Sequence, residues 1–75
     1  MSILKMFNKF KNGERVLVNG FGKNSGKYYS RKRGHVICRD PYYKDYNIIF
    51  PDGTEDWFNE EDLRKSRKEN NKKWK

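Results

Sequence analysis

Alternating hydrophobic and polar positions predict four short β-strands in the middle of the chain. The predicted strands are residues 14–19, 34–39, 45–50 and 54–58. Successive side chains of a strand point to opposite faces, so every second residue can be buried. The residues predicted to face the core are Val16, Val18, Val36, Cys38, Tyr46, Ile48, Phe50 and Phe58, with Ile49 and Trp57 on the opposite face.

Turn residues separate these strands. Asn12-Gly13 precedes the first strand, and Asp40-Pro41 ends the second, because proline has no backbone donor and restricts the residue before it. The sequence Phe50-Pro51-Asp52-Gly53-Thr54 predicts a tight hairpin. Residues 19–34 contain four glycines and no apolar periodicity, which predicts one long loop.

The two ends carry weaker patterns. In residues 1–10, apolar side chains at helical spacing predict a short helix that packs over the domain, or an arm anchored only at Phe10. Asn59 and the three acids after it predict a helix start, which ranges from a 3₁₀ turn ending at Leu63 to a helix reaching about Asn70. We therefore divide the chain into residues 1–9 (arm or short helix), 10–63 (domain) and 64–75 (basic tail).

The order of these pieces resembles the SH3-like small barrels of the Tudor and KOW kind. The resemblance covers roughly residues 10–63. The resemblance implies an all-β barrel of four to five antiparallel strands, found in small bacterial or phage accessory proteins, that binds RNA, proteins or protein tails without catalysis. No clear fifth strand follows Leu63, so the N-terminal segment is the alternative for filling that place. The matching residues are Phe10, Gly13, Arg15, Val16 and Val18, then Gly34 and Val36, then Tyr46, Ile48, Phe50, Asp52 and Gly53, then Trp57, Phe58, Glu61, Asp62 and Leu63.

Charge is unevenly distributed along the 75 residues. The net charge of +8 divides into +9 for residues 1–39, −7 for residues 40–62 and +6 for residues 63–75. Such polarity can steer one face of a protein toward a polyanion, although a solvated surface explains it equally well. The single cysteine, Cys38, allows no internal disulfide, and no apolar run is long enough for a signal peptide or a membrane span. These features predict a cytoplasmic protein with no membrane partner.

One basic segment is the leading candidate for nucleic-acid binding. Cations can contact phosphates, and tyrosine rings can stack on unpaired bases. The alternative is a solvated loop whose tyrosines cover the edge of the barrel. The predicted nucleic-acid-binding residues are Lys23, Lys27, Tyr28, Tyr29, Arg31, Lys32 and Arg33, with support from the 64–75 tail.

A protein-binding role is the alternative prediction. Tyr42, Tyr43 and Trp57 lie in the acidic region 40–62, and exposed aromatics are typical anchors of protein interfaces. An adaptor or phage-encoded modulator of a host protein would use this aromatic and acidic face. An aromatic cage that includes Tyr46 is less favoured than burial of Tyr46. We expect a monomer, with a dimer as the alternative if a sheet edge stays open.

The candidate catalytic and cofactor motifs in the sequence do not match the residue patterns that such sites require. Gly20 and Gly26 are one residue too far apart for a phosphate-binding loop, and Tyr28 replaces the hydroxyl residue that would bind the metal. His35 and Cys38 offer two metal ligands where a structural zinc needs four. We therefore predict a non-catalytic protein with no metal and no cofactor.

Overall fold

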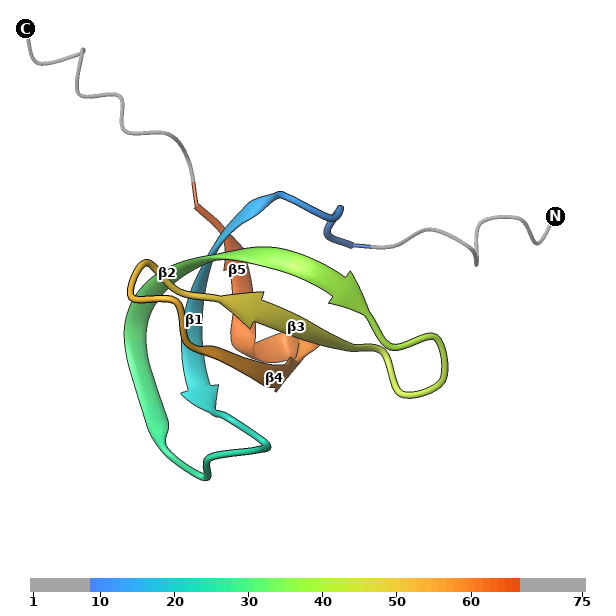
Figure 1. Cartoon of the computed structure of the whole chain (residues 1–75). Coiled ribbons are helices and arrows are strands. Elements are labelled where there is room, and N and C mark those ends of the chain that lie inside the picture. Colours follow the sequence, from blue (N-terminus) through green and yellow to red (C-terminus); the bar gives the residue numbers. More distant parts are fainter. Residues whose placement is uncertain (1–8, 67–75) are drawn as a thin grey trace, which may run out of the picture.

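The computed structural model describes residues 9–66 as one antiparallel sheet. Its five strands are β1 (Arg15–Phe21), β2 (Tyr28–Arg39), β3 (Asp45–Ile49), β4 (Glu55–Asn59) and β5 (Leu63–Lys65), with a 3₁₀ turn η2 (Glu60–Asp62) before β5. The strand order is β4-β3-β2-β1-β5 (Figure 1). The predicted all-β class is therefore confirmed, and β4 and β5 form the two edges of the sheet.

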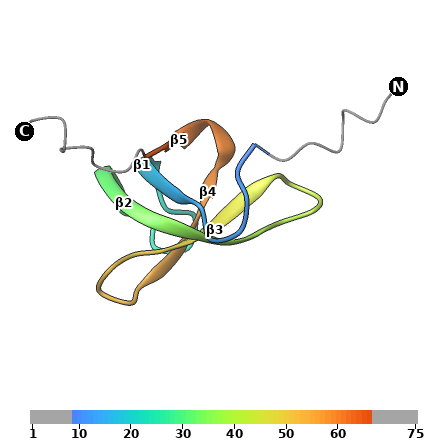
Figure 2. The same ribbon diagram turned by 90° about the horizontal axis from the view of Figure 1, so that it is seen from above.

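The sheet is strongly curved but stays open. The pairing of β1 with β2 shifts register between Val18 and Gly20, and the pairing of β2 with β3 shifts between Val36 and Cys38. Such bulges bend a strand and increase its twist, and β2 curves around the other strands in both views (Figures 1 and 2). Within residues 9–66 no ladder joins β4 to β5, so the sheet is not closed into the predicted barrel.

The concave side of the sheet encloses the core. Nine buried side chains form it: Phe10, Val16, Val18, Val36, Tyr46, Ile48, Phe50, Phe58 and Leu63. This confirms every residue that the alternation predicted to be inward except Cys38. The bulge in β2 places Cys38 opposite Asn47, while Val36 lies opposite Ile48, so the two side chains do not share a face. Cys38 is half-buried as a result.

Phe10 packs the segment before β1 against this core. Its ring meets the Tyr46 ring edge-on, with 5.3 Å between centroids. The Phe10 amide donates to the Tyr46 hydroxyl at 3.3 Å, and that hydroxyl donates to Glu60 Oε2 at 3.2 Å. Tyr46 therefore packs in the core and also satisfies its polar end, which a buried tyrosine requires.

The turns follow the predicted chemistry. Gly53 has a φ of +91°, and its amide donates to the Phe50 carbonyl at 2.8 Å, which closes the β3–β4 hairpin. Strand β2 ends at Arg39, before Asp40-Pro41, as predicted. Asp40 Oδ1 then accepts the amides of Tyr42 at 2.8 Å and Tyr43 at 3.2 Å, and this bonding shapes the β2–β3 turn.

Two predictions about irregular segments are wrong. Residues 19–34 are not one loop, because β1 continues to Phe21 and β2 begins at Tyr28, which leaves only residues 22–27 between the strands. A fifth strand does follow η2, so Arg64 and Lys65 belong to β5 rather than to a tail. Asn59 precedes η2 but makes no side-chain capping bond. Residues 1–8 of the predicted N-terminal helix or arm (1–9) and residues 67–75 of the predicted tail (64–75) lie outside the described residues.

Truncating Phe58 tests the assigned core. Phe58→Ala should lower the free energy of unfolding by about 3–5 kcal/mol, since it leaves a cavity between the two hairpins. Tyr42→Ala, at an exposed position, is the matched control and should change stability by less than about 0.5 kcal/mol. Urea unfolding followed by circular dichroism measures both, and equal midpoints for the two variants would contradict this core.

Candidate functional site

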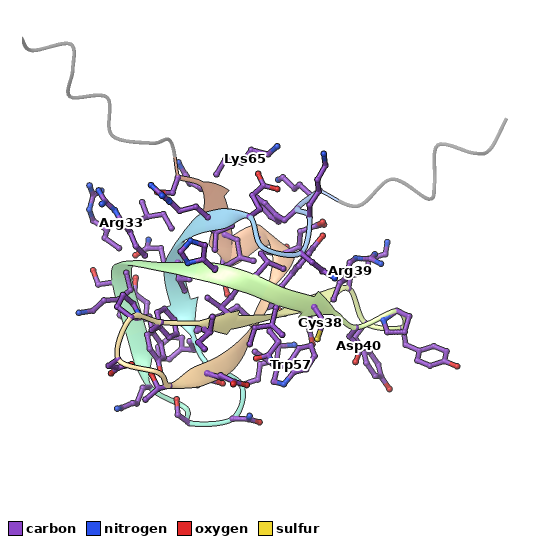
Figure 3. The ribbon with its side chains drawn as sticks, turned by 45° about the horizontal axis from the view of Figure 1, so that its top comes forward. Arg33, Cys38, Arg39, Asp40, Trp57 and Lys65 are labelled. Carbon is purple, nitrogen blue, oxygen red and sulfur yellow. The ribbon has the colours of Figure 1, made fainter. Side chains whose placement is uncertain are left out.

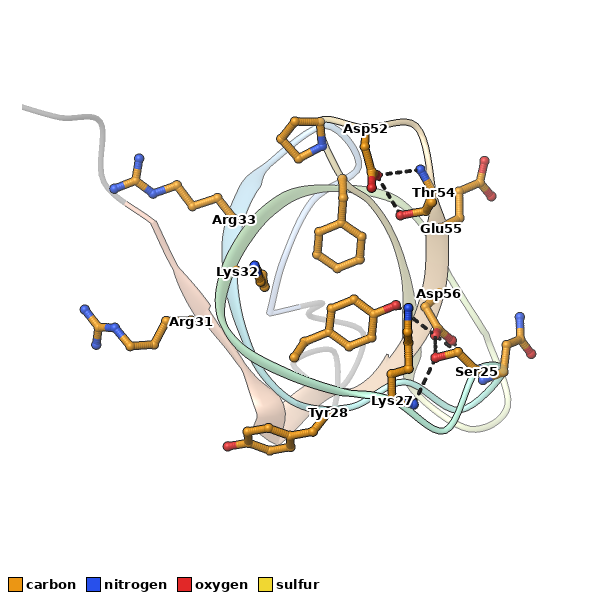
Figure 4. A pocket seen from close by; sticks show the side chains of 14 residues that line it. Ser25, Lys27, Tyr28, Arg31, Lys32, Arg33, Asp52, Thr54, Glu55 and Asp56 are labelled. Atoms are coloured by element: carbon orange, nitrogen blue, oxygen red, sulfur yellow. Dashed lines mark hydrogen bonds between the residues drawn. The ribbon is translucent and has the colours of Figure 1, made fainter.

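An open groove lies between the β1–β2 hairpin and the β3–β4 hairpin. Its volume is about 1150 Å³ (Figure 4). Six of the seven predicted nucleic-acid-binding residues line it: Lys27, Tyr28, Tyr29, Arg31, Lys32 and Arg33. The sequence analysis missed the opposite wall, which consists of Phe50, Pro51, Asp52, Thr54, Glu55 and Asp56, with Asn24 and Ser25 at the end.

Aromatic packing forms the base of this groove. The Tyr29 ring stacks on Phe50 with 4.9 Å between centroids and 8° between planes. It also meets Phe58 edge-on at 5.1 Å. One face of Tyr29 is therefore occupied by the protein, and its main role is to extend the core. Both Tyr28 and Tyr29 were predicted to stack on bases, and of these two only Tyr28 is mainly exposed.

Asp56 holds the β1–β2 loop in place. Only 1% of its surface is exposed. Its carboxylate accepts the Asn24 amide at 2.8 Å, the Ser25 amide at 3.3 Å and the Ser25 hydroxyl at 2.6 Å. The Tyr29 hydroxyl donates at 3.5 Å and the Trp57 amide at 2.8 Å. A buried carboxylate needs this many donors, and here they come from the loop, from β2 and from β4.

Hydrogen bonding also sets the ionisation of Asp56. Burial opposes the charged form and by itself would raise the pKa of Asp56, but the bonds donated by Ser25, Asn24 and Trp57 outweigh it. The pKa therefore lies below the ordinary aspartate value. Gly22 is required beside this carboxylate, because a Cβ at that position would collide with the Asp56 side chain.

The side chains of β2 project from both faces of the sheet. Between Val18 and Gly20 the register gains a residue on β2, and Arg31 adopts a φ of +48° there. The Arg31 amide donates to Asn19 Oδ1 at 3.2 Å, which stabilises the bulge. Tyr29 packs inward against Phe50. Tyr28, Arg31 and Arg33 point away from the ring of strands (Figure 4). The five predicted residues that lie in β2 therefore form two surfaces.

Lys23 does not belong with the other six residues. Its Nζ lies 3.1 Å from Asp45 Oδ2 in an exposed ion pair. Its amide donates to the Trp57 carbonyl at 2.9 Å, so the backbone of Lys23 bridges to β4. The cation of Lys23 is therefore partly neutralised and lies apart from the groove.

The strand order separates the charges that the sequence only suggested. Strands β1, β2 and β5 carry seven Lys or Arg residues (one, four and two) and no acid. Strands β3 and β4 carry three acids and no Lys or Arg. Because β5 pairs with β1, Arg64 and Lys65 lie beside the basic segment before residue 40. One half of the sheet is cationic as a result.

The three residues predicted for protein binding are not gathered into one site. Tyr42 and Tyr43 lie in the β2–β3 turn with 85% and 75% of their surface exposed. Trp57 is half-buried on β4, opposite Asn47, on the side of the molecule away from Arg33 (Figure 3). Among residues 9–66, no aromatic pair joins Trp57 to either tyrosine. Tyr46 is fully buried and cannot contribute to a cage.

Metal ligation, membrane insertion and similarity to known proteins give no further information about the function of this groove. The described part of the chain contains no group of three or more His, Cys, Asp or Glu side chains placed to hold a metal ion. Over residues 9–66 there is also no helix with the length and apolar character needed to cross a membrane. No protein-family model matches this chain, and a search of curated proteins finds no significant match. The site must therefore be interpreted from its own chemistry.

Replacing Asp56 tests whether it organises the loop. Asp56→Asn should lower the free energy of unfolding at pH 7 by about 1.5–3 kcal/mol, because an amide cannot accept all the bonds that the carboxylate accepts. The ionised form stabilises the fold, since the pKa of Asp56 is lower in the folded chain. That contribution is present above the unfolded pKa of about 4 and is lost as the pH falls through the folded pKa.

The difference between wild type and Asp56→Asn should therefore shrink in urea unfolding below about pH 3. Asp52→Asn is the matched control, because Asp52 is exposed and its carboxylate accepts bonds from the hydroxyl and amide of Thr54, two residues away in the same turn. The control should lose less stability. An Asp56→Asn protein as stable as wild type at pH 7 would contradict the assigned role.

Proposed function

We propose that this protein is a non-catalytic, cytoplasmic SH3-like module of the Tudor/KOW type that binds RNA or single-stranded DNA. The observation that carries the proposal is the collection of the strand cations on β1, β2 and β5, next to an open groove. The five-stranded antiparallel order supports such a module. The proposal rests on this local chemistry and not on a relative of known function.

The proposed mechanism begins with electrostatic capture. Lys27, Arg31, Lys32 and Arg33 contact phosphates and release the counterions that surround them, which supplies most of the affinity. Lys23 contributes less, because its cation already pairs with Asp45. Tyr28 stacks on a base, and Tyr29 supports the groove from below. Stacking requires an unpaired base, so a single strand or an RNA loop fits better than a duplex.

Oligonucleotide affinity at several salt concentrations tests this function. A fluorescent single-stranded oligonucleotide should bind at low salt and lose affinity steeply as salt rises. The variant K27Q/K32Q/R33Q should reduce the slope of log affinity against log salt by between about 0.7 and 2, since it removes one to three phosphate contacts and each removes about 0.7 for a single strand. K44Q is the matched control, because Lys44 lies in the β2–β3 turn away from the groove. Absence of binding by the wild type at low salt would reject the function.

Protein binding through the β2–β3 turn is the second candidate. The high exposure of two adjacent tyrosines at a turn fixed by Asp40 favours it. Rigid exposed tyrosines anchor interfaces at low entropic cost. In this case the protein is an adaptor, or a phage-encoded modulator of a host protein.

A capture experiment from nuclease-treated bacterial lysate tests this candidate. Under this hypothesis the wild type retains a partner that Y42A/Y43A does not retain, because the anchors are gone. R33Q serves as the control and should retain the partner. A partner that disappears on nuclease treatment, or one held equally by Y42A/Y43A, would contradict the protein-binding role.

A further inference from the structure

The outward face of β2, β1 and β5 presents a set of aligned arginines. Leu17 of β1 lies opposite Arg33 on β2 and opposite Arg64 on β5, so these three residues form one row across the sheet. Arg15 lies two residues away from Leu17 on the same face, opposite His35. Arg31 points to this side as well (Figure 4). Adjacent strands are about 4.8 Å apart, so Arg33 and Arg64 are separated by about 10 Å at the backbone.

These arginines have no acidic partner within the described part of the chain. The ion pairs formed among residues 9–66 are Lys23 with Asp45 and Lys65 with Glu14. Tyr28, Arg31 and Arg33 also line the groove, but they point away from the ring of strands (Figure 4). The rest of the groove differs from the arginine face, since its far wall carries the acids Asp52 and Glu55 opposite Lys27 and Lys32. A polyanion is repelled by that wall and attracted to the arginine face. Electrostatics therefore favours the outward face over the groove as the path of a phosphate backbone.

An exposed aromatic pair lies at one end of the same face. Phe21 and Tyr28 are paired across β1 and β2, and their ring centroids are 4.9 Å apart. Phe21 is 62% exposed and Tyr28 is 54% exposed, so neither ring serves to fill the core. Phe21 shares the outward alternation of Leu17 and Asn19 along β1. The pair thus adjoins the arginines and can receive a base.

We propose that the outward face of β2, β1 and β5 is a track for a single-stranded nucleic acid. Phe21 and Tyr28 hold a base at one end, and Arg31, Arg33, Arg64 and Arg15 hold successive phosphates. The track follows β1 from Phe21 to Arg15, a path of about 20 Å at 3.3 Å per residue. This inference rests on the proposed function, and it moves the main contacts from the groove to the outward face.

Four variants separate the two surfaces. R33Q/R64Q removes two arginines of the track, F21A removes half of the aromatic pair, K27Q/K32Q removes two groove cations, and K44Q is the control. The probe is a fluorescent oligothymidylate series of about 4 to 16 nucleotides, measured at several salt concentrations. Circular dichroism and thermal unfolding establish that each variant is folded, as exposed positions lead us to expect.

The track predicts a specific pattern of affinity. R33Q/R64Q should lower the salt slope by about 1.4, and F21A should weaken binding by roughly tenfold with the slope unchanged. K27Q/K32Q should lower the salt slope by less than R33Q/R64Q does, because the acids Asp52 and Glu55 share the groove with these two lysines. K44Q should remain within about threefold of the wild type. A duplex of matched length should bind more weakly than the single strand, since its bases cannot stack on Phe21.

Other outcomes overturn the track in distinguishable ways. If K27Q/K32Q weakens binding as much as or more than R33Q/R64Q, the track is wrong while nucleic-acid binding by the groove stands. If the wild type binds no oligonucleotide at low salt, both the track and the proposed function fail. If vesicles with anionic headgroups bind the arginine face and oligonucleotides do not, the partner is a membrane surface and the track is also rejected.

Discussion

The pairing of β1 with two neighbours at once is the constraint on which the rest of the structure depends. Strand β1 pairs with β2 on one side and with β5 on the other, and Val18 lies opposite Leu63. This pairing buries Leu63 in the core and brings Arg64 into line with Arg33. Without this pairing, the cations of β2 and those of β5 would belong to separate parts of the chain. With it, they form one charged surface on a folded sheet.

The acidic half of the sheet, β3 and β4, holds the cationic hairpin β1–β2 in place. Asp56 belongs to β4, yet it accepts hydrogen bonds from the loop that begins the cationic hairpin. Tyr29 then stacks on Phe50 and links β2 to the β3–β4 hairpin through the core. These contacts fix the start of β2, where Tyr28 and Arg31 project outward. A rigid start to β2 reduces the entropy lost when a ligand binds, so packing on one side of the sheet would support the recognition that we propose for the other.

The sequence predicted the elements that depend on local patterns and missed those that depend on pairing. Alternation identified the inward residues of β1, β3 and β4. Pro51 and Gly53 identified the hairpin between β3 and β4. Cys38 was placed on the wrong face, because a bulge reverses the alternation and leaves no mark in the sequence. The start of β2 and the whole of β5 carry no alternation of apolar and polar residues, so only their ladders with β1 define them. Lys27, Tyr28 and Arg31 to Arg33 were found from composition, and Arg64 was included only as part of the basic tail. Strand register alone adds Phe21 and Arg15 to the proposed site and aligns Arg64 with Arg33.

The most direct test of this account is a nuclear Overhauser measurement across β1 in solution. The account predicts cross-strand contacts between the backbone protons of Leu17 and Arg33, between Leu17 and Arg64, and between Val18 and Leu63, because antiparallel partners lie within about 5.5 Å of each other at Cα. Contacts from Leu17 to Arg33 alone, with random-coil shifts for residues 63–65, would contradict it. The cationic surface would then lack the strand that completes it.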